Sequence, residues 1–98
     1  MVTLHIEHKI TDFPTWSGAF ERFAEARIQA GVRHERVRRG VDDDCWVVID
    51  LAFDTSDEAK AFREFLQTNV WGTPLAPALV GEATATILED VSPAVSSV

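Results

Sequence analysis

The chain has 98 residues, which is the length of one small domain. A formal net charge of −7 argues against nucleic acid and anionic membranes as partners, because phosphate binding needs clustered cations. The single cysteine, Cys45, excludes an internal disulfide, and no stretch approaches the roughly 20 apolar residues of a membrane span, so we expect a cytoplasmic protein.

The first segment, residues 2–10, alternates between apolar and polar side chains, as a half-buried strand does. Asp12 then has the position of a helix N-cap, and Pro14 suits the first turn. The following apolar residues have helical spacing up to Gly31, which has the position of a C′ glycine. This stripe is Trp16, Ala19, Phe20, Phe23, Ala26 and Ala30. Arg27 interrupts it, and we expect its stem to follow the edge of the core while its head reaches water or a carboxylate.

Two further strands are expected at residues 32–40 and 45–53, joined by a turn at residues 41–44. The second of them is apolar on nearly both faces, which favours a position in the middle of a sheet. Its two faces are Cys45, Val47, Ile49, Leu51 and Phe53 on one side, and Trp46, Val48, Asp50 and Ala52 on the other.

A second helix is predicted from Thr55 and Glu58, which have capping-box spacing, to the Trp71-Gly72-Thr73-Pro74 segment. Its stripe is Ala59, Phe62, Leu66 and Val70. Pro77 and Gly81 predict irregular structure before a last strand at residues 83–91. Residues 1–91 then form one domain, and residues 92–98 are expected to be a flexible tail.

The order strand, helix, two strands, helix, strand is the split βαβ pattern of the ferredoxin-like α+β class. It predicts a four-stranded antiparallel sheet with the first and third strands at its centre and both helices on one face. Trp46 and Val48 then lie on the face that the chain itself does not cover. A second copy is the simplest cover for such a face, so we expect a homodimer.

Two segments resemble the dimeric α+β barrel superfamily, which includes the antibiotic-biosynthesis-monooxygenase-like proteins. They are Thr11-Asp12-Phe13-Pro14-Thr15-Trp16 with Phe20, and Val48-Ile49-Asp50-Leu51-Ala52-Phe53-Asp54-Thr55 with Ala59 and Phe62. The resemblance implies two ferredoxin-like subunits packed sheet to sheet, with a cavity between each sheet and its helices. Members of the superfamily include monooxygenases, haem-degrading enzymes, isomerases and ligand-sensing domains. The function of this chain therefore has to be inferred from its candidate site residues.

His5, Glu7 and Asp50 are the first candidate site, because neighbouring central strands could bring a histidine and carboxylates together for acid–base catalysis. The same groups could instead satisfy one another in a dimer interface. His8 points to the opposite face and is expected to be a hydrogen-bonded edge histidine, while His34 is expected to be exposed. No two histidines have metal-site spacing, so no metal is expected.

Asn69 and Trp71 are the second candidate site, by resemblance to the monooxygenases that hold a flat aromatic substrate with an Asn and a Trp. The simpler interpretation, which we favour, is that Trp71 caps the core where the helix ends. Residues 59–80 contain no histidine, which argues against haem, and the chain has no tyrosine to act as a proton donor.

The remaining motifs favour structural roles. Cys45 is expected to be a buried thiol, and Asp42-Asp43-Asp44 a solvated turn. Phosphate loops, CxxC pairs and serine-hydrolase elbows are absent, and we expect no cofactor. The sequence therefore favours a dimeric module that binds a small apolar ligand or has no catalytic role. The alternative is a cofactor-independent monooxygenase, isomerase or cyclase for an aromatic or polyketide-like molecule, in which Asn69 and Trp71 hold the substrate and His5 or Asp50 is the acid or base.

Overall fold

The computed structural model describes residues 1–91, so the tail expected at residues 92–98 lies outside the described part of the chain. Its elements in chain order are β1 (Val2–Ile10), α1 (Phe13–Arg22), α2 (Ala24–Ala30), β2 (His34–Arg39), β3 (Trp46–Phe53), α3 (Ser56–Phe65), the π-helical turn η1 (Leu66–Val70) and β4 (Leu79–Glu89). In this range no helix has the length and apolar character needed to cross a membrane.

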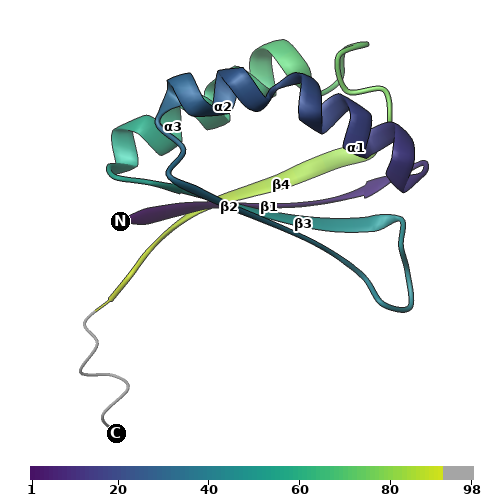
Figure 1. Cartoon of the computed structure of the whole chain (residues 1–98), viewed down its shortest axis with the longest axis horizontal. Helices are drawn as coiled ribbons and strands as arrows, with labels where there is room; N and C mark the ends of the chain where they lie inside the picture. The colour runs from purple at the N-terminus through teal and green to yellow at the C-terminus, as the bar shows by residue number, and fades with distance from the viewer. Residues whose placement is uncertain (92–98) are drawn as a thin grey trace, which may run out of the picture.

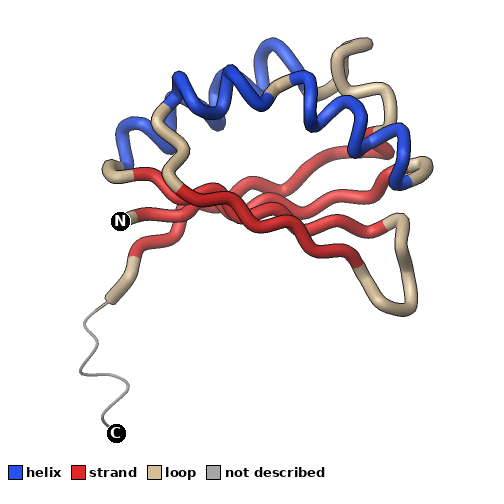
Figure 2. Tube along the Cα trace, viewed as in Figure 1, coloured by secondary structure: helices blue, strands red, loops and turns tan. Residues whose placement is uncertain are grey.

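The four strands form one antiparallel sheet in the order β2-β3-β1-β4, and the helices form a second layer on one face of it (Figures 1 and 2). This is the ferredoxin-like α+β architecture, with the first and third strands at the centre as the element order predicts. Within residues 1–91 no helix lies over the opposite face of the sheet, which we call the open face.

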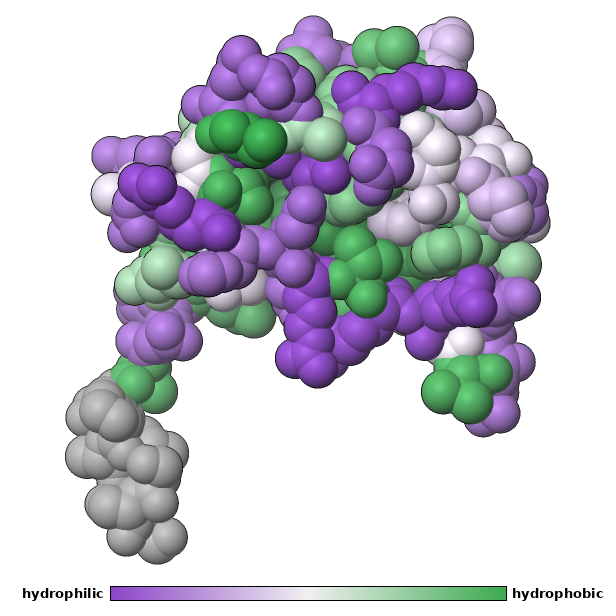
Figure 3. Space-filling model, viewed as in Figure 1, coloured by the Kyte–Doolittle hydropathy of each residue, from purple (hydrophilic) through white to green (hydrophobic). Residues whose placement is uncertain are grey.

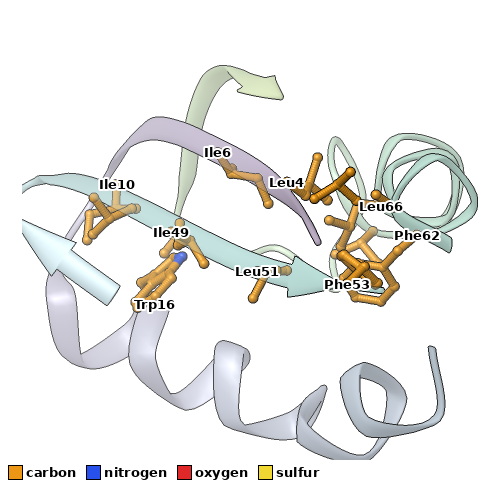
Figure 4. Packing of buried hydrophobic residues seen from close by; sticks show 14 residues of the cluster. Leu4, Ile6, Ile10, Trp16, Ile49, Leu51, Phe53, Phe62 and Leu66 are labelled. Carbon is orange, nitrogen blue, oxygen red and sulfur yellow. The ribbon is translucent and has the colours of Figure 1, made fainter. Parts of the chain in front are cut away.

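Strict alternation along the central strands sorts side chains between the two layers. β1 and β3 pair from Val2 with Phe53 to Lys9 with Trp46, so their apolar rows align on the helix side. Figure 4 shows Trp16 of α1 between the helix and the sheet, near Ile49. The largest side chains with almost no exposed surface are Phe53, Leu4, Leu51 and Val47.

The predicted first helix is divided at Phe23 into α1 and α2. Asp12 is its N-cap, where Oδ1 accepts the N–H of Thr15 at 2.8 Å, and Gly31 ends α2 with a φ of 99°. At the division, Phe23 has a φ of −100° and a ψ of 11°, outside the helical region. At the break the Phe20 carbonyl accepts both the N–H of Phe23 and a hydrogen bond from Arg27.

The capping box of α3 forms as its spacing predicts. Thr55 Oγ1 accepts the N–H of Glu58, and Glu58 Oε1 accepts the N–H of Thr55. Glu58 also meets the end of α2, because a methyl group placed on Gly31 would lie 2.5 Å from Glu58 Oε2. Gly31 is therefore required both by its positive φ and by this close approach.

The last strand begins at Leu79, four positions before the predicted start at Ala83. Lys9 pairs with Val80 and Glu7 with Thr84, so β4 contains two more residues than β1 over this stretch. Gly81, with a φ of 72°, is part of the resulting bulge. The prediction was wrong here because Gly81 interrupts the strand pattern without ending the pairing.

Candidate functional site

A cavity of about 80 Å³ lies between the sheet and the helix layer. The sheet contributes Ile6, His8, Ile49 and Leu51 to its wall, the helices contribute aromatic side chains, and the segment after η1 contributes Trp71 and Leu75. Trp71 is half-buried and Leu75 is exposed, so this segment separates the cavity from solvent. Figure 3 shows apolar groups reaching the surface where the two layers meet.

Aromatic and cationic side chains form a continuous row along the cavity. The ring centroids of His8 and Trp16 are 6.4 Å apart, and those of Trp16 and Phe20 are stacked at 4.8 Å. The Cζ atom of Arg27 lies 3.6 Å from the centroid of Phe20, in cation–π contact. His8 and Arg27 are thus the two polar side chains at the ends of an aromatic surface.

His8 is 4% exposed and lies on the central strand β1, which corrects the expectation of an edge histidine. Its Nδ1 lies 3.0 Å from the carbonyl oxygen of Lys9. A carbonyl only accepts hydrogen bonds, so Nδ1 carries a proton and donates it. Burial lowers the pKa of His8 below 6.5, which outweighs the opposing effect of the Lys9 carbonyl and favours the neutral ring.

Arg27 is also 4% exposed, which is rare for an arginine unless it is paired. Its Nε donates to Glu35 Oε2 at 2.6 Å and its Nη1 donates to the carbonyl oxygen of Phe20 at 2.6 Å. The head of Arg27 therefore reaches a carboxylate, as expected, while its stem and guanidinium form part of the cavity wall.

The structure separates the residues of the second candidate site. Trp71 lines the cavity, whereas Asn69 is exposed on η1 and is not part of the cavity wall. A ligand in the cavity could therefore meet Trp71, but not both side chains in the present arrangement.

The first candidate site forms on the open face. His5 Nδ1 lies 2.6 Å from Asp50 Oδ1, and His5 Nε2 lies 2.8 Å from Glu7 Oε2. Arg38 Nη2 donates to Asp50 Oδ2 at 2.7 Å. Hydrogen bonds to Glu7, and then to Asp50, raise the pKa of His5 above 6.5.

This four-residue network lies on the opposite side of the sheet from the cavity. His5 and Asp50 pair directly across β1 and β3, and both alternate with the buried residues that face the helices. They cannot act as acid or base on a ligand in the cavity of the same subunit. Both ring nitrogens of His5 are already bonded to carboxylates, which fits a structural role.

The hairpin between β2 and β3 brings Asp43, Asp44 and Cys45 together, with one ligand atom of each within 4.8 Å of the others. Both aspartates are exposed, as expected of a solvated turn. Cys45 is half-buried instead of fully buried, and desolvation together with the nearby aspartates raises the pKa of its thiol. A raised pKa lowers the thiolate fraction and argues against a nucleophile.

His8 and Arg27 are the polar groups of the cavity that the sequence did not identify as a site. Two signals were present. His8 shares the parity of the buried residues of β1, and Arg27 interrupts the apolar stripe of its helix. Neither signal says that the two residues face one cavity, because that depends on how the helices cross the sheet.

No protein-family model matches the sequence, and no curated protein matches it. Solved structures match over nearly their whole length. A candidate antibiotic biosynthesis monooxygenase from Nitrosomonas europaea is 17% identical with a TM-score of 0.71, over 94% of this chain and 100% of the other. A dimeric ferredoxin-like protein from an uncultured marine organism is 13% identical with a TM-score of 0.66, over 93% and 96%.

SnoaB, a cofactor-independent oxygenase from Streptomyces nogalater, is 20% identical with a TM-score of 0.64, over 94% of this chain and 96% of the other. The chain therefore has the ferredoxin-like fold of the antibiotic-biosynthesis-monooxygenase-like proteins, as the resemblance in its sequence predicts. At these identities the similarity establishes the fold, and the function has to be argued from the cavity and the open face.

Proposed function

We propose that the protein is a homodimer, paired through the open face of its sheet, in which each subunit binds a small flat apolar ligand between sheet and helices. The cavity is the observation on which this proposal depends. Its wall is apolar, with several aromatic rings and few polar groups, which is the general form of a small-molecule site.

The size of the cavity limits the ligand. A volume of about 80 Å³ is well below the roughly 300–1,000 Å³ of sites for drug-sized molecules. An apolar cavity of about 150 Å³ is known to hold benzene, so a one-ring ligand requires the wall to yield until this cavity has expanded to nearly twice its present volume. The segment from Trp71 to Ala78, which has no helix or strand, is the part of the wall best able to do so.

The hydrogen-bonded network on the open face supports the pairing of two subunits through this face. Each of Arg38, Asp50, His5 and Glu7 has a partner, as groups buried in an interface require. Trp46 and Val48 are half-buried there, and Leu88 is 47% exposed. Two of the similar structures are described as dimeric ferredoxin-like proteins.

Toluene binding, followed by NMR of the indole groups of Trp16 and Trp71, tests the ligand site. Ala19 lines the cavity from α1, so Ala19→Leu should fill it and weaken binding at least tenfold. Ala61→Leu is the matched control, since Ala61 is exposed on α3 and should leave binding unchanged. Absence of toluene binding to the unmodified protein, even near saturation, would reject the ligand site.

A cofactor-independent monooxygenase is the second candidate function, and the position of Trp71 on the cavity wall favours it. An anthrone has three fused rings, so this function requires the segment from Trp71 to Ala78 to open more widely than a one-ring ligand needs. The test is oxygen uptake with an anthrone-type substrate, which O₂ converts to the quinone and water. The oxygenase proposal expects turnover that Trp71→Phe reduces at least tenfold. Turnover that Trp71→Phe leaves unchanged would contradict a role for this cavity.

A further inference from the structure

We propose that His8 is the hydrogen-bond acceptor of the cavity, and that the preferred ligand is a hydroxylated aromatic molecule of the phenol type whose O–H donates to His8 Nε2. This inference rests on the proposed function, because it names the chemical class of the ligand that the cavity would take.

The hydrogen bond of His8 to the backbone fixes which nitrogen accepts. Nδ1 faces the Lys9 carbonyl oxygen at 3.0 Å and must be the protonated nitrogen. In a neutral ring Nε2 then has a lone pair and no proton, so it can accept a hydrogen bond but cannot donate one. The backbone carbonyl of Lys9 thus fixes the tautomer of His8, and with it the nitrogen that can accept a hydrogen bond.

Nε2 is not bonded to any group of residues 1–91. No fully enclosed side-chain nitrogen or oxygen in this part of the chain lacks a partner, so Nε2 must retain contact with space that a small molecule can enter. His8 itself is 4% exposed and lines the cavity, which makes the cavity the space in question. A lone pair in apolar surroundings is then left for a ligand to satisfy.

The rest of the wall favours an aromatic donor. The stacked rings of Trp16 and Phe20 provide a flat surface that begins beside His8. At the far end, Arg27 uses Nε and Nη1 for Glu35 and Phe20, and its guanidinium disfavours a cationic ligand. A neutral phenol fits both ends, whereas an ether or a hydrocarbon leaves Nε2 unpaired.

Three one-ring probes separate these possibilities: phenol, anisole, whose oxygen only accepts, and toluene. We expect phenol to bind roughly fivefold more tightly than the other two, which is the effect of one net hydrogen bond. In protein with ¹⁵N-labelled histidine, phenol should shift the resonance of Nε2, and toluene should not. His8→Leu should abolish the preference for phenol while toluene still binds, and His34→Leu, at an exposed position, should retain it.

The outcomes distinguish this inference from the proposed function. If all three probes bind equally, or if His8→Leu keeps the preference, the role of His8 is wrong and the cavity remains a ligand site. If none of them binds, the proposed function itself fails. If His8→Leu does not fold, the labelled unmodified protein decides, since an Nε2 resonance that phenol leaves in place overturns the inference.

Discussion

His5 and His8 are three positions apart on β1, yet the fold shifts their pKa values in opposite directions. Two carboxylates beside His5 stabilise its protonated ring, whereas burial of His8 stabilises its neutral ring. The difference follows from the alternation of a strand, which places one ring on the open face and the other against the cavity.

The shift at His5 predicts a stability contribution that is complete at acidic pH. Because its folded pKa is raised, the contribution is present below 6.5 and is lost as the pH rises through the folded value. His5→Gln should therefore lower the free energy of unfolding more at pH 5.5 than at pH 9, measured by urea denaturation. An equal loss of unfolding free energy at both pH values would show that Glu7 and Asp50 do not stabilise the protonated ring of His5.

The shift at His8 predicts the opposite dependence. Because its folded pKa is lowered, its contribution is present above 6.5 and is lost as the pH falls through the folded value. The free energy of unfolding of the unmodified protein, measured by urea denaturation, should therefore fall more between pH 8 and pH 5 than that of His8→Leu. His34→Gln removes the third histidine, at an exposed position, and is the matched substitution for both.

Sequence reasoning identified the residue types of a site but not their neighbours. The pairing of His5 with Asp50 could be expected, because it follows from strand order and period. The meeting of His8 and Arg27 at one cavity could not, because it depends on the break at Phe23 and on how α1 and α2 lie on the sheet. Asn69 was assigned to a site with Trp71 by residue type, from the resemblance to the monooxygenases, and on the π-helical turn η1 it is exposed to solvent.

At the scale of elements, the capping box of α3 stabilises the helix that carries Phe62 against the sheet. Thr55→Ala removes the acceptor for the N–H of Glu58 and should lower the free energy of unfolding by about 1 kcal/mol. Ser56→Ala, at the exposed first residue of α3, is the matched control and should change it by less than half as much. A loss of equal size in both variants would count against a specific role for the cap.

The elements themselves were predicted well where period and caps agreed. β1, β3 and the N-termini of α1 and α3 begin within a residue or two of the expected positions. The two misses lie where contacts outside the local pattern matter. At the division of the first helix Arg27 donates a hydrogen bond to the Phe20 carbonyl, and β4 continues through Gly81 because it remains paired with β1.

At the scale of the whole molecule, the open face predicts the state of assembly. Leu88 lies on this face, paired with Thr3, and a charge there should oppose sheet-to-sheet packing. Leu88→Glu should raise the dimer dissociation constant at least tenfold in sedimentation. Ile28→Glu places the same charge at an exposed apolar residue of α2 and should have no effect. Sedimentation of the unmodified protein as a 10.9 kDa particle would reject the dimer outright.

The close approach of Glu58 to Gly31 brings the end of α2 beside the beginning of α3, which is far away in the chain. No side chain larger than hydrogen fits between them, so the two helix ends can lie this close only because residue 31 is glycine. The other end of the helix layer leads into the irregular stretch that contains Trp71 and Leu75. The end of the helix layer at Trp71 thus has the less regular backbone, and it is where we expect a ligand to enter the cavity.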